Sequence, residues 1–470
     1  MTTITFLGGV DEIGGNKVLV RDGDHAILLD FGMSFGRFGT YYEEFLSPRT
    51  VNGMGDFLEM GLLPDLPGIY RADLLRLLGR QSMEDRAVDA CFISHAHADH
   101  LNYVSFLRPD IAVHMGETAK LLVEGITEGR GRAIDFEVLD FKERPINRKE
   151  PPVPRDIQTF RTGNTVKVGD MEIVPVHVDH SVPGAYGFII RTSEGTLVYS
   201  GDVRLHGSNP GMTEEFAARA AEAEPDALIT EGTRIDSDAR ASEASVSTTC
   251  SDEMAGAGGK VVFTEFNFKD VDRLRTFSEL ALTQDRKLVI GYKEACILKR
   301  YAADPGLENV PSLDDDHIAL FQPRKKSGTY DEKDYGVSER PFYQRDNVLT
   351  ADQIHDRQQE LIVFVNMWNF GNLIDMRPNK GSLYVHSLSE PFNDEMRISN
   401  ERKDAWLDHF GLKRVNAHCS GHASGPELRE LINRIAPNRL FPIHTEHPEL
   451  FTGLETNDVV RVKVAKEYTL

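Results

Sequence analysis

The chain has 470 residues, of which 40% are hydrophobic, and a formal net charge of −21 at pH 7. The length predicts two to three domains, and the four scattered cysteines form no disulfide framework. The longest apolar stretch, 361–374, is too short to span a bilayer, and the first residues do not resemble a signal peptide. These properties exclude a membrane-spanning or disulfide-built protein, and we expect a soluble protein of the cytoplasm.

The net negative charge disfavours broad binding to nucleic acid, because the phosphates of such a partner would be repelled at long range. Basic residues nevertheless gather locally, and bound divalent metals would add positive charge that the sequence count omits. A threaded single strand therefore stays compatible with the composition. The basic groups, each of which alone is typical of a solvated helix face, are Lys269/Arg273/Arg275, Lys293/Lys299/Arg300 and Arg324/Lys325/Lys326.

The N-terminal residues predict a hairpin followed by a buried strand. Residues 3–7 and 17–21 flank the turn-forming Gly8-Gly9, and the apolar residues 26–30 end on Asp30. The segment 33–89 is rich in aromatic residues and glycine, with an amphipathic helix expected at 71–78. The aromatic side chains at 35–45 are typical of a cap on a core, with stacking on bases as the alternative. A lid over the site is a further alternative for the segment as a whole.

The motif His95-Ala96-His97-Ala98-Asp99-His100 follows the apolar strand 90–93 and carries four metal-competent side chains. Imidazole and carboxylate together suit Zn²⁺ or a related ion. Because His95 and His97 alternate, both can face one metal, while Asp99 and His100 can face a second. Two metals about 3.5–4 Å apart are the usual device for hydrolysing phosphate esters.

Further strand ends downstream each present one more candidate ligand. We expect helices at 103–107 and 117–124, a surface loop at 142–160, and a meander of strands at 165–168, 171–176, 186–192 and 196–200. His180 and Asp202 follow two of these strands, and His444 follows a strand at 439–443. The coincidence of so many ligands at strand ends argues against a polar turn that carries histidines by chance.

From about residue 235 the pattern changes to alternating strands and helices. Strands are predicted at 261–266 and 287–291, and amphipathic helices at 271–282 and 294–302. Residues 304–355 look irregular and charged. The remaining predicted elements are strands at 360–365 and 382–385, a helix at 426–435 and a last strand at 459–464.

The ligand pattern resembles the metallo-β-lactamase fold, an α/β architecture in which an αββα sandwich holds its ligands on loops at one edge. Asp202 and His444 are 444 − 202 = 242 residues apart, far more than a single-domain member needs. The βα block between them resembles the inserted domain of the β-CASP nucleases. We therefore expect a first part of the metallo-β-lactamase domain at 1–235, the inserted β-CASP domain at 236–411 and a closing part at 412–470.

Three short motifs carry the resemblance to the β-CASP nucleases further. The run 229–233 is similar to the acidic motif A, with Glu231 as its acid, and 418–424 to motif B, with His422 as its histidine. The run 441–446 resembles motif C, which contains His444. Within this family the chain is most similar to ribonuclease J, whose N-terminal signature resembles 7–16 and whose Gly-Ser-Gln-Gly-Glu-Pro loop resembles 386–391.

The chain also departs from ribonuclease J. Its segment 33–89 is longer than the family needs, the segment 264–269 matches only loosely, and the chain stops soon after motif C. These departures leave the substrate and the oligomeric state open, with a homodimer as one alternative.

By resemblance, His95, His97 and His180 hold one zinc, Asp99, His100 and His444 hold the other, and Asp202 bridges them. His177 competes with His180, which we favour because the Ser-Val-Pro that follows it matches the family. The family chemistry is attack on phosphorus by a hydroxide that two zinc ions, or Mn²⁺ in their place, generate. Catalysis then rests on Asp99, Glu231 and His422, where Glu231 orients His422 to protonate the leaving oxygen, while Asp30 orients a ligand from behind.

The resemblance also implies residues that bind substrate. Ser387, Ser389, His418, Ser420 and Gly421 lie on loops that in ribonuclease J accompany a 5′-terminal monophosphate, although such serines are equally typical of plain turns. The resulting hypothesis is a zinc-dependent ribonuclease that acts on single-stranded RNA as a 5′→3′ exonuclease, an endonuclease or both. The alternatives are a β-CASP nuclease of DNA, an inactive RNA-binding subunit and a small-ester hydrolase. Because all seven metal ligands are present, an inactive subunit is disfavoured. A small-ester hydrolase is disfavoured because the chain contains the inserted domain.

Overall fold

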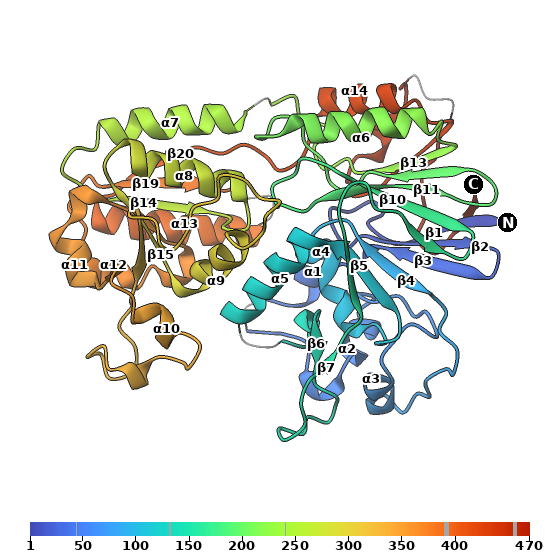
Figure 1. Ribbon diagram of the computed structural model, residues 1–470, viewed down its shortest axis with the longest axis horizontal. Helices are drawn as coiled ribbons and strands as arrows, with labels where there is room; N and C mark the ends of the chain where they lie inside the picture. The colour runs from blue at the N-terminus through green and yellow to red at the C-terminus, as the bar shows by residue number, and fades with distance from the viewer. Residues whose placement is uncertain (44, 131–132, 240, 390–393, 455–457) are drawn as a thin grey trace.

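The computed structural model describes residues 1–470 except 44, 131–132, 240, 390–393 and 455–457. The chain forms two lobes, one built from two packed sheets and the other from a single sheet (Figure 1). No helix among the described residues is long and apolar enough to cross a membrane.

The first sheet of the larger lobe begins with an antiparallel hairpin and continues as parallel strands. Its order is β23-β1-β2-β3-β4-β5-β8, and pairing changes from antiparallel to parallel at β3. The predicted hairpin is present, since Thr3 lies opposite Arg21. The buried strand that follows pairs on both sides, with Val18 opposite Leu29 and Leu29 opposite Phe92. The strands are Thr2–Gly8 (β1), Lys17–Asp22 (β2), His25–Leu29 (β3), Ala90–Ile93 (β4), Ala112–Gly116 (β5), Ile157–Phe160 (β8) and Glu467–Thr469 (β23).

The second sheet combines the predicted meander with two strands from distant parts of the chain. Its order is β22-β21-β13-β12-β11-β10-β9, with parallel pairing from β12 to β22. The pairing of β13 with β21 brings motif C beside motif A. The strands are Val166–Val168 (β9), Met171–His177 (β10), Tyr186–Arg191 (β11), Thr196–Tyr199 (β12), Ala227–Thr230 (β13), Arg439–Pro442 (β21) and Asp458–Val459 (β22).

The two sheets pack face to face around one apolar core, and helices cover both outer faces, so this lobe is an αββα sandwich. Phe6, Phe92, Phe188 and Phe441 meet between the sheets. The helices α6 (Pro210–Glu222) and α14 (Gly425–Ile435) lie side by side on the second sheet (Figure 1). A layer of short helices and turns covers the outer face of the first sheet. It consists of α1 (Phe35–Tyr41), α2 (Gly55–Glu59), α3 (Ala72–Leu77), α4 (Ala98–Leu101), α5 (Glu117–Gly129) and the 3-10 turns Thr50–Asn52 (η1), Asn102–Phe106 (η2) and Ile134–Phe136 (η3).

The segment 33–89 belongs to this outer layer. Met54, Phe57 and Tyr70 are buried in the core beneath it, while Phe35 and Phe45 are exposed. Of the aromatic residues at 35–45, Tyr42 is buried and Phe38 packs against the core, as the predicted cap requires, whereas the others are exposed. A two-stranded hairpin, Asp140–Phe141 (β6) with Val153–Pro154 (β7), lies next to this layer.

The smaller lobe is a seven-stranded parallel sheet with helices on both faces, as predicted for the βα block. Its order is β17-β16-β15-β18-β14-β19-β20, and all six strand pairs are parallel. Alternating residues such as Val262 and Phe263 face opposite cores, as expected for a sheet buried on both sides. The strands are Val262–Phe266 (β14), Lys287–Ile290 (β15), Ile318–Phe321 (β16), Val348–Leu349 (β17), Leu361–Phe364 (β18), Leu383–Ser387 (β19) and Lys413–Asn416 (β20).

One apolar core joins the two lobes. Helix α5 of the sandwich packs along α9 (Tyr292–Tyr301) of the parallel lobe, and Gly125 permits this approach because a Cβ there would lie 2.9 Å from the backbone of Ile297.

The smaller lobe contains most of the remaining helices. They are Glu243–Ala255 (α7), Val271–Thr283 (α8), α9, Arg340–Tyr343 (α10), Ala351–Asp356 (α11), Asn372–Met376 (α12) and Asp394–Phe410 (α13), with 3-10 turns at Glu332–Asp334 (η4), Gln358–Glu360 (η5) and Met367–Asn369 (η6). The 3-10 turn Pro448–Phe451 (η7) belongs to the sandwich.

Three sequence predictions were wrong in part. The loop 142–160 ends in β8, whose Phe160 is buried against Tyr186. The irregular region 304–355 contains β16, a fully buried four-residue strand that its charged surroundings conceal. The last strand at 459–464 is confined to Val459, because the chain then turns and pairs β23 with β1.

The division of the chain into domains stays a proposal. Strand β20 pairs with β19 and extends the third sheet past residue 411. We therefore propose that the closing part of the sandwich starts after Asn416, a few residues later than the predicted boundary of 412. The predicted first part, 1–235, and the predicted start of the insertion at 236 are unchanged.

Candidate metal centre

The site lies at the edge of the sandwich where several strands end. Strands β4, β10, β12 and β21 run in the same direction and deliver the motif 95–100, His180, Asp202 and His444. Parallel strands present their carboxyl ends on one edge, so side chains distant in sequence meet there. The structure brings all seven predicted ligands together in two clusters.

The first cluster consists of His95, His97 and His180. The Nε2 atoms of His95 and His180 each lie 3.1 Å from Nδ1 of His97. Three ring nitrogens thus converge on one point, in the spacing that ligands around one tetrahedral ion adopt.

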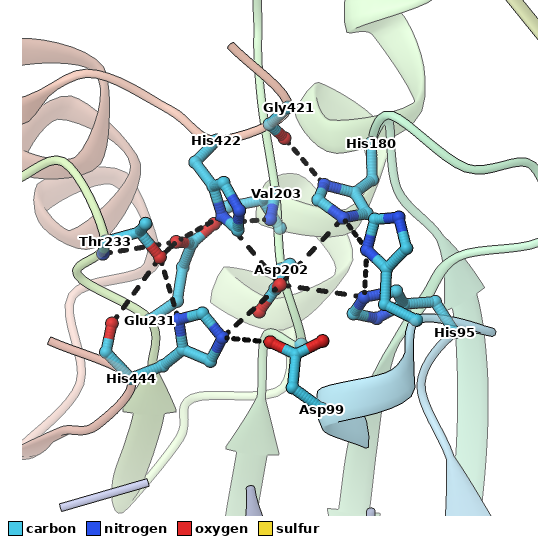
Figure 2. Close-up of polar contacts among 12 residues, drawn as sticks. His95, Asp99, His180, Asp202, Val203, Glu231, Thr233, Gly421, His422 and His444 are labelled. Atoms are coloured by element: carbon cyan, nitrogen blue, oxygen red, sulfur yellow. Dashed lines mark hydrogen bonds and ion pairs between the residues drawn. The ribbon is translucent and has the colours of Figure 1, made fainter. Parts of the chain in front are cut away.

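The second cluster consists of Asp99, His100 and His444, and Asp202 lies between the two clusters (Figure 2). Oδ2 of Asp99 is 3.2 Å from Nε2 of His444. Oδ2 of Asp202 faces imidazoles of both clusters and is therefore placed to bridge them. Its distances to Nε2 are 3.1 Å for His100, 3.6 Å for His95, 3.8 Å for His444 and 3.9 Å for His180.

In His100 and His180, the ring nitrogen that points away from the centre of the site, Nδ1, makes a hydrogen bond that holds the ring in place. Nδ1 of His100 donates to Oδ2 of Asp30 at 2.7 Å, and Nδ1 of His180 donates to the carbonyl of Gly421 at 2.6 Å. A carboxylate or carbonyl oxygen at Nδ1 leaves Nε2 as the ring nitrogen that faces the centre of the site and can bind a metal.

Two hydroxyl groups hold the other rings. Ser94 donates to Asp30, so its oxygen accepts from Nδ1 of His95 at 3.0 Å. Thr233 donates to Glu231 and in the same way accepts from Nδ1 of His444 at 2.8 Å. All four imidazoles therefore present Nε2 inward, as metal ligation requires.

The donor set fits divalent metal ions. Nε2 of His100 and Oδ1 of Asp202 are buried and have no hydrogen-bond partner among the described residues. Buried polar atoms without partners are costly unless something satisfies them. Imidazole and carboxylate ligands in this number suit zinc at both positions.

The two clusters differ in charge. Burial lowers the pKa of His95 and His180, and that of His97 to about 3, so these rings are neutral. Burial also opposes protonation of His100 and His444, but the neighbouring carboxylates, chiefly Asp202, raise the pKa of both rings. The carboxylates around the second cluster therefore stabilise positive charge on these rings, and a bound metal ion would replace their protons.

His422 stands over the metal centre and is paired with Glu231. Its Nδ1 lies 2.9 Å from Oε2 of Glu231 and 3.8 Å from Oδ2 of Asp202 (Figure 2). Glu231 also accepts from the backbone N–H of Val203 at 2.8 Å, which fixes the carboxylate. Burial lowers the pKa of His422, but Glu231, Asp202 and Asp99 outweigh it and raise the pKa to about 9.

Close packing of the N-terminal loop positions Asp99. Gly14 has φ +80°, and a Cβ on it would lie 2.8 Å from Cβ of Asp99. Gly32 approaches the backbone of Asp99 more closely still, while Asn16 donates its N–H to the carbonyl of Asp99 at 3.1 Å. The Gly-rich signature at 7–16 therefore supports a ligand.

The five predicted substrate-binding residues have different surroundings. Ser387 is buried, where its hydroxyl bonds Arg273 and the carbonyl of Ala417, whereas Ser389 is exposed. The hydroxyl of Ser420 accepts from the N–H of His422 at 3.1 Å, and Gly421 holds His180 as described. His418 is half-buried with Nδ1 unpartnered among the described residues. Two residues of the same predicted loop, Glu390 and Pro391, lie outside the described residues.

Comparisons with known proteins agree with this geometry. Residues 64–257 match the model of the beta-lactamase superfamily domain, and residues 412–451 match that of the Zn-dependent metallo-hydrolase RNA specificity domain. The first of these segments is therefore similar to the beta-lactamase superfamily domain, and the second to the RNA specificity domain. A protein of unknown function from Enterococcus faecalis has the same fold, with a TM-score of 0.75, 23% identity and full coverage of both chains.

Among curated proteins, the chain is similar to several that are named ribonuclease J. It is 25% identical to that of Sinorhizobium meliloti over 96% of this chain and 70% of the relative. It is 24% identical to that of Pyrococcus abyssi over 99% of this chain and 95% of the relative. The ribonuclease J resemblance therefore extends over nearly the whole chain.

Sequence reasoning missed the roles of two hydroxyl residues. Ser94 immediately precedes His95, and Thr233 lies within motif A, yet neither was assigned a function. The role of Ser94 depends on Asp30, which the fold brings to its hydroxyl, and the role of Thr233 depends on His444, which the fold brings to it. Tyr199, which donates to Asp30 at 2.6 Å, was missed for the same reason.

Proposed function

We propose that the chain is a zinc-dependent ribonuclease that hydrolyses phosphodiester bonds in single-stranded RNA. The observation that carries the proposal is the pair of ligand clusters sharing Asp202, with the His422–Glu231 pair beside them. The match to an RNA specificity domain and the relatives named ribonuclease J support RNA as the substrate.

The ligands proposed for one zinc are His95, His97 and His180, those for the other are Asp99, His100 and His444, and Asp202 is shared. Two such ions, for which Mn²⁺ can substitute, supply an activated water and offset charge on the phosphate oxygens. The residues around them keep the ligands oriented, and they shield His95, His100 and Asp202, which are at most 1% exposed, from solvent. His97 is half-buried.

His422 is proposed to donate the proton that the leaving 3′ oxygen needs. With its pKa raised to about 9, the ring is protonated at neutral pH. Glu231 accepts from Nδ1 and so stabilises the imidazolium and holds the ring over Asp202. Asp99 serves the reaction as a ligand of the second cluster.

Binding of the RNA 5′ end is proposed for the loop 418–421 with Ser389. Ser420 and His418 are half-buried beside the motif B histidine, and Ser389 is exposed at the end of β19. In the present structure Ser387 and Gly421 use their oxygens for internal hydrogen bonds, so we propose that these two shape the loop. A phosphate at this position would favour 5′→3′ exonuclease action.

The test is digestion of a 5′-monophosphorylated, 3′-labelled single-stranded RNA by zinc-loaded protein, with Asp99→Ala as control. We expect shortening from the 5′ end that the Asp99→Ala variant lacks. Internal cuts would assign endonuclease action instead. Cleavage of a matched DNA alone, or of neither polymer, would contradict the proposal.

Two finer expectations complete the proposal. The four cysteines are free and buried, which supports a reducing compartment such as the cytoplasm. A homodimer is proposed on the exposed Phe35, Phe45 and Val51 of the outer layer. Light scattering of the purified protein tests this, and a monomer at micromolar concentration would reject it.

A further inference from the structure

A cavity separate from the metal centre lies where strands β14 and β18 end, at the carboxyl edge of the parallel sheet. Its volume is about 400 Å³, and both lobes contribute to its lining. We call it the Trp368 cavity, after a lining that includes Arg130, Glu265, Lys269, Lys293 and Trp368. Open parallel sheets bind ligands at this edge.

Trp368 is presented to solvent by a rigid turn. Its side chain is 88% exposed, although the chain around it is apolar. The side chain of Asn366 accepts from the N–H of Trp368 at 3.1 Å and caps the turn η6. Buried Glu265 accepts from the N–H of Met367 at 3.2 Å and is itself held by Tyr384 and Lys403. A fixed, exposed indole is a ready stacking surface.

Two cations in the cavity are free to meet an anion. Among the nine residues of the predicted basic groups, Lys269 and Lys293 alone have side chains without a hydrogen bond or ion pair to any described residue. The others are used internally: Arg273 by Glu243, Arg275 by Asp272, Lys299 and Arg300 by Glu128, Arg324 by Asp375, Lys325 by Glu339 and Lys326 by a backbone carbonyl.

The carboxylates of the cavity do not cancel these charges. Glu265 forms an ion pair with Lys403 at 2.5 Å, so its charge is already matched. Glu294 is the other carboxylate of the lining, which also contains the cations Arg130, Lys269 and Lys293. The cavity therefore offers net positive charge beside an aromatic face, the combination that binds single-stranded nucleic acid.

The cavity and the metal centre are connected through the core that the two lobes share. Phe268, which lines the cavity beside Lys269, belongs to the same apolar core as Ala96 of the metal motif and Leu101 directly after it. Lys269 is in turn within the electrostatic influence of Asp99. It also belongs to the segment 264–269, which matches ribonuclease J only loosely, and Glu265 of the same segment positions the Trp368 turn. One segment of this chain therefore builds both the stacking surface and the cation.

We propose that the Trp368 cavity binds one unpaired nucleotide of the RNA whose scissile phosphate lies at the metal centre, with the base stacked on Trp368 and its phosphate at Lys269. This proposal rests on the proposed function. Base stacking tolerates every sequence, so the cavity would hold the strand in place without selecting its bases.

The test combines cavity variants with RNAs that carry a single abasic residue at successive positions. On intact RNA we expect Trp368→Ala to raise KM roughly 5- to 50-fold, Trp368→Phe to retain most of the affinity, and kcat to change far less than KM. An abasic residue at one position should raise the wild-type KM by a similar factor and leave that of Trp368→Ala unchanged. Ile374→Ala, which removes an exposed apolar side chain outside the cavity, is the matched control.

An unchanged KM for Trp368→Ala would overturn the proposal. It would also be overturned if the abasic position that most weakens the wild type raised the KM of Trp368→Ala by the same factor. Binding of a hydrolysis-resistant phosphorothioate RNA, followed by fluorescence anisotropy, separates this outcome from failure of the proposed function. Wild-type protein that binds this RNA through Trp368 without cutting any RNA would reject the ribonuclease alone. Protein that binds none of these RNAs would reject both.

Discussion

The metal centre and the Trp368 cavity hold their side chains in opposite ways. At the metal centre, His100 and Asp202 are fully buried, and a second hydrogen bond fixes the outer nitrogen of four imidazoles. In the cavity, Trp368 is 88% exposed and Lys269 has no partner among the described residues. Rigid, dry ligands suit a step in which charge develops at one point, whereas exposed groups suit a strand of varying sequence.

This difference indicates a division of labour between the lobes. The sandwich holds every residue proposed for the chemistry, and the parallel lobe contributes a surface that grips the strand. Substitutions in the first region should change kcat or metal content, and those in the second should change KM.

Replacing the shared ligand should have the largest effect. Asp202→Asn keeps the shape but removes the charge that both clusters share, so zinc content and kcat should both fall, with kcat lower by about 10³-fold or more. Metal analysis and initial rates on labelled RNA measure this. The exposed turn variant Asp24→Asn is the control, and an Asp202→Asn enzyme with normal turnover would contradict the bridging role.

Removing the proposed proton donor should affect turnover without removing metal. His422→Gln preserves a polar side chain beside Glu231 but cannot act as an imidazolium, so we expect kcat to fall about 10²- to 10⁴-fold. Zinc content and KM should stay close to wild type. Loss of zinc in this variant would show that His422 is instead a ligand.

Removing the hydroxyl that holds the ligand His444 should have a smaller effect than the two preceding substitutions, and it should change metal affinity. Thr233→Val removes the hydroxyl between Glu231 and His444, and zinc affinity should fall about 10- to 100-fold. Excess zinc should then restore most of the activity. Thr248→Val, on the exposed face of α7, is the matched control, and equal chelator sensitivity of the two variants would count against the role of Thr233.

The smallest expected effect is a pH dependence of KM. Burial and the charge of Arg130 lower the pKa of Lys269, against the opposing charge of Asp99, to about 8. The Lys269 side chain is positively charged below this pH and neutral above it. Because the charged form is the one that binds phosphate, the wild-type KM should rise between pH 7 and 9. Lys269→Gln should have a higher KM at pH 7 and lack this rise. The same pH profile in both proteins would exclude Lys269 as the phosphate contact.

The ligands could be predicted from sequence because each follows a strand and belongs to a residue type with few other uses there. The stacking of His177 on Tyr186, with ring centroids 4.6 Å apart, likewise accounts for the choice of His180. Ser94 and Thr233 could not be assigned, since their function depends on which side chains the fold brings to them. Trp368 lies in an apolar run that predicts burial, and only the Asn366 cap turns it outward.

The missed elements have a similar cause. Helix α7 buries only a narrow stripe of Val246, Cys250 and Met254 within a polar sequence, so its amphipathic pattern is weak. Strand β16 is four residues long and lies between charged segments. Tertiary contacts with neighbouring strands, which the local sequence does not record, define both.

Stepwise zinc loading of metal-free protein, with zinc content and RNA cleavage measured on the same samples, tests the central claim most directly. Two ligand clusters that share Asp202 predict two zinc ions per chain, with turnover reaching its plateau only when the second is bound. Full cleavage of RNA with one zinc per chain, or in the presence of excess chelator, would contradict a dinuclear ribonuclease.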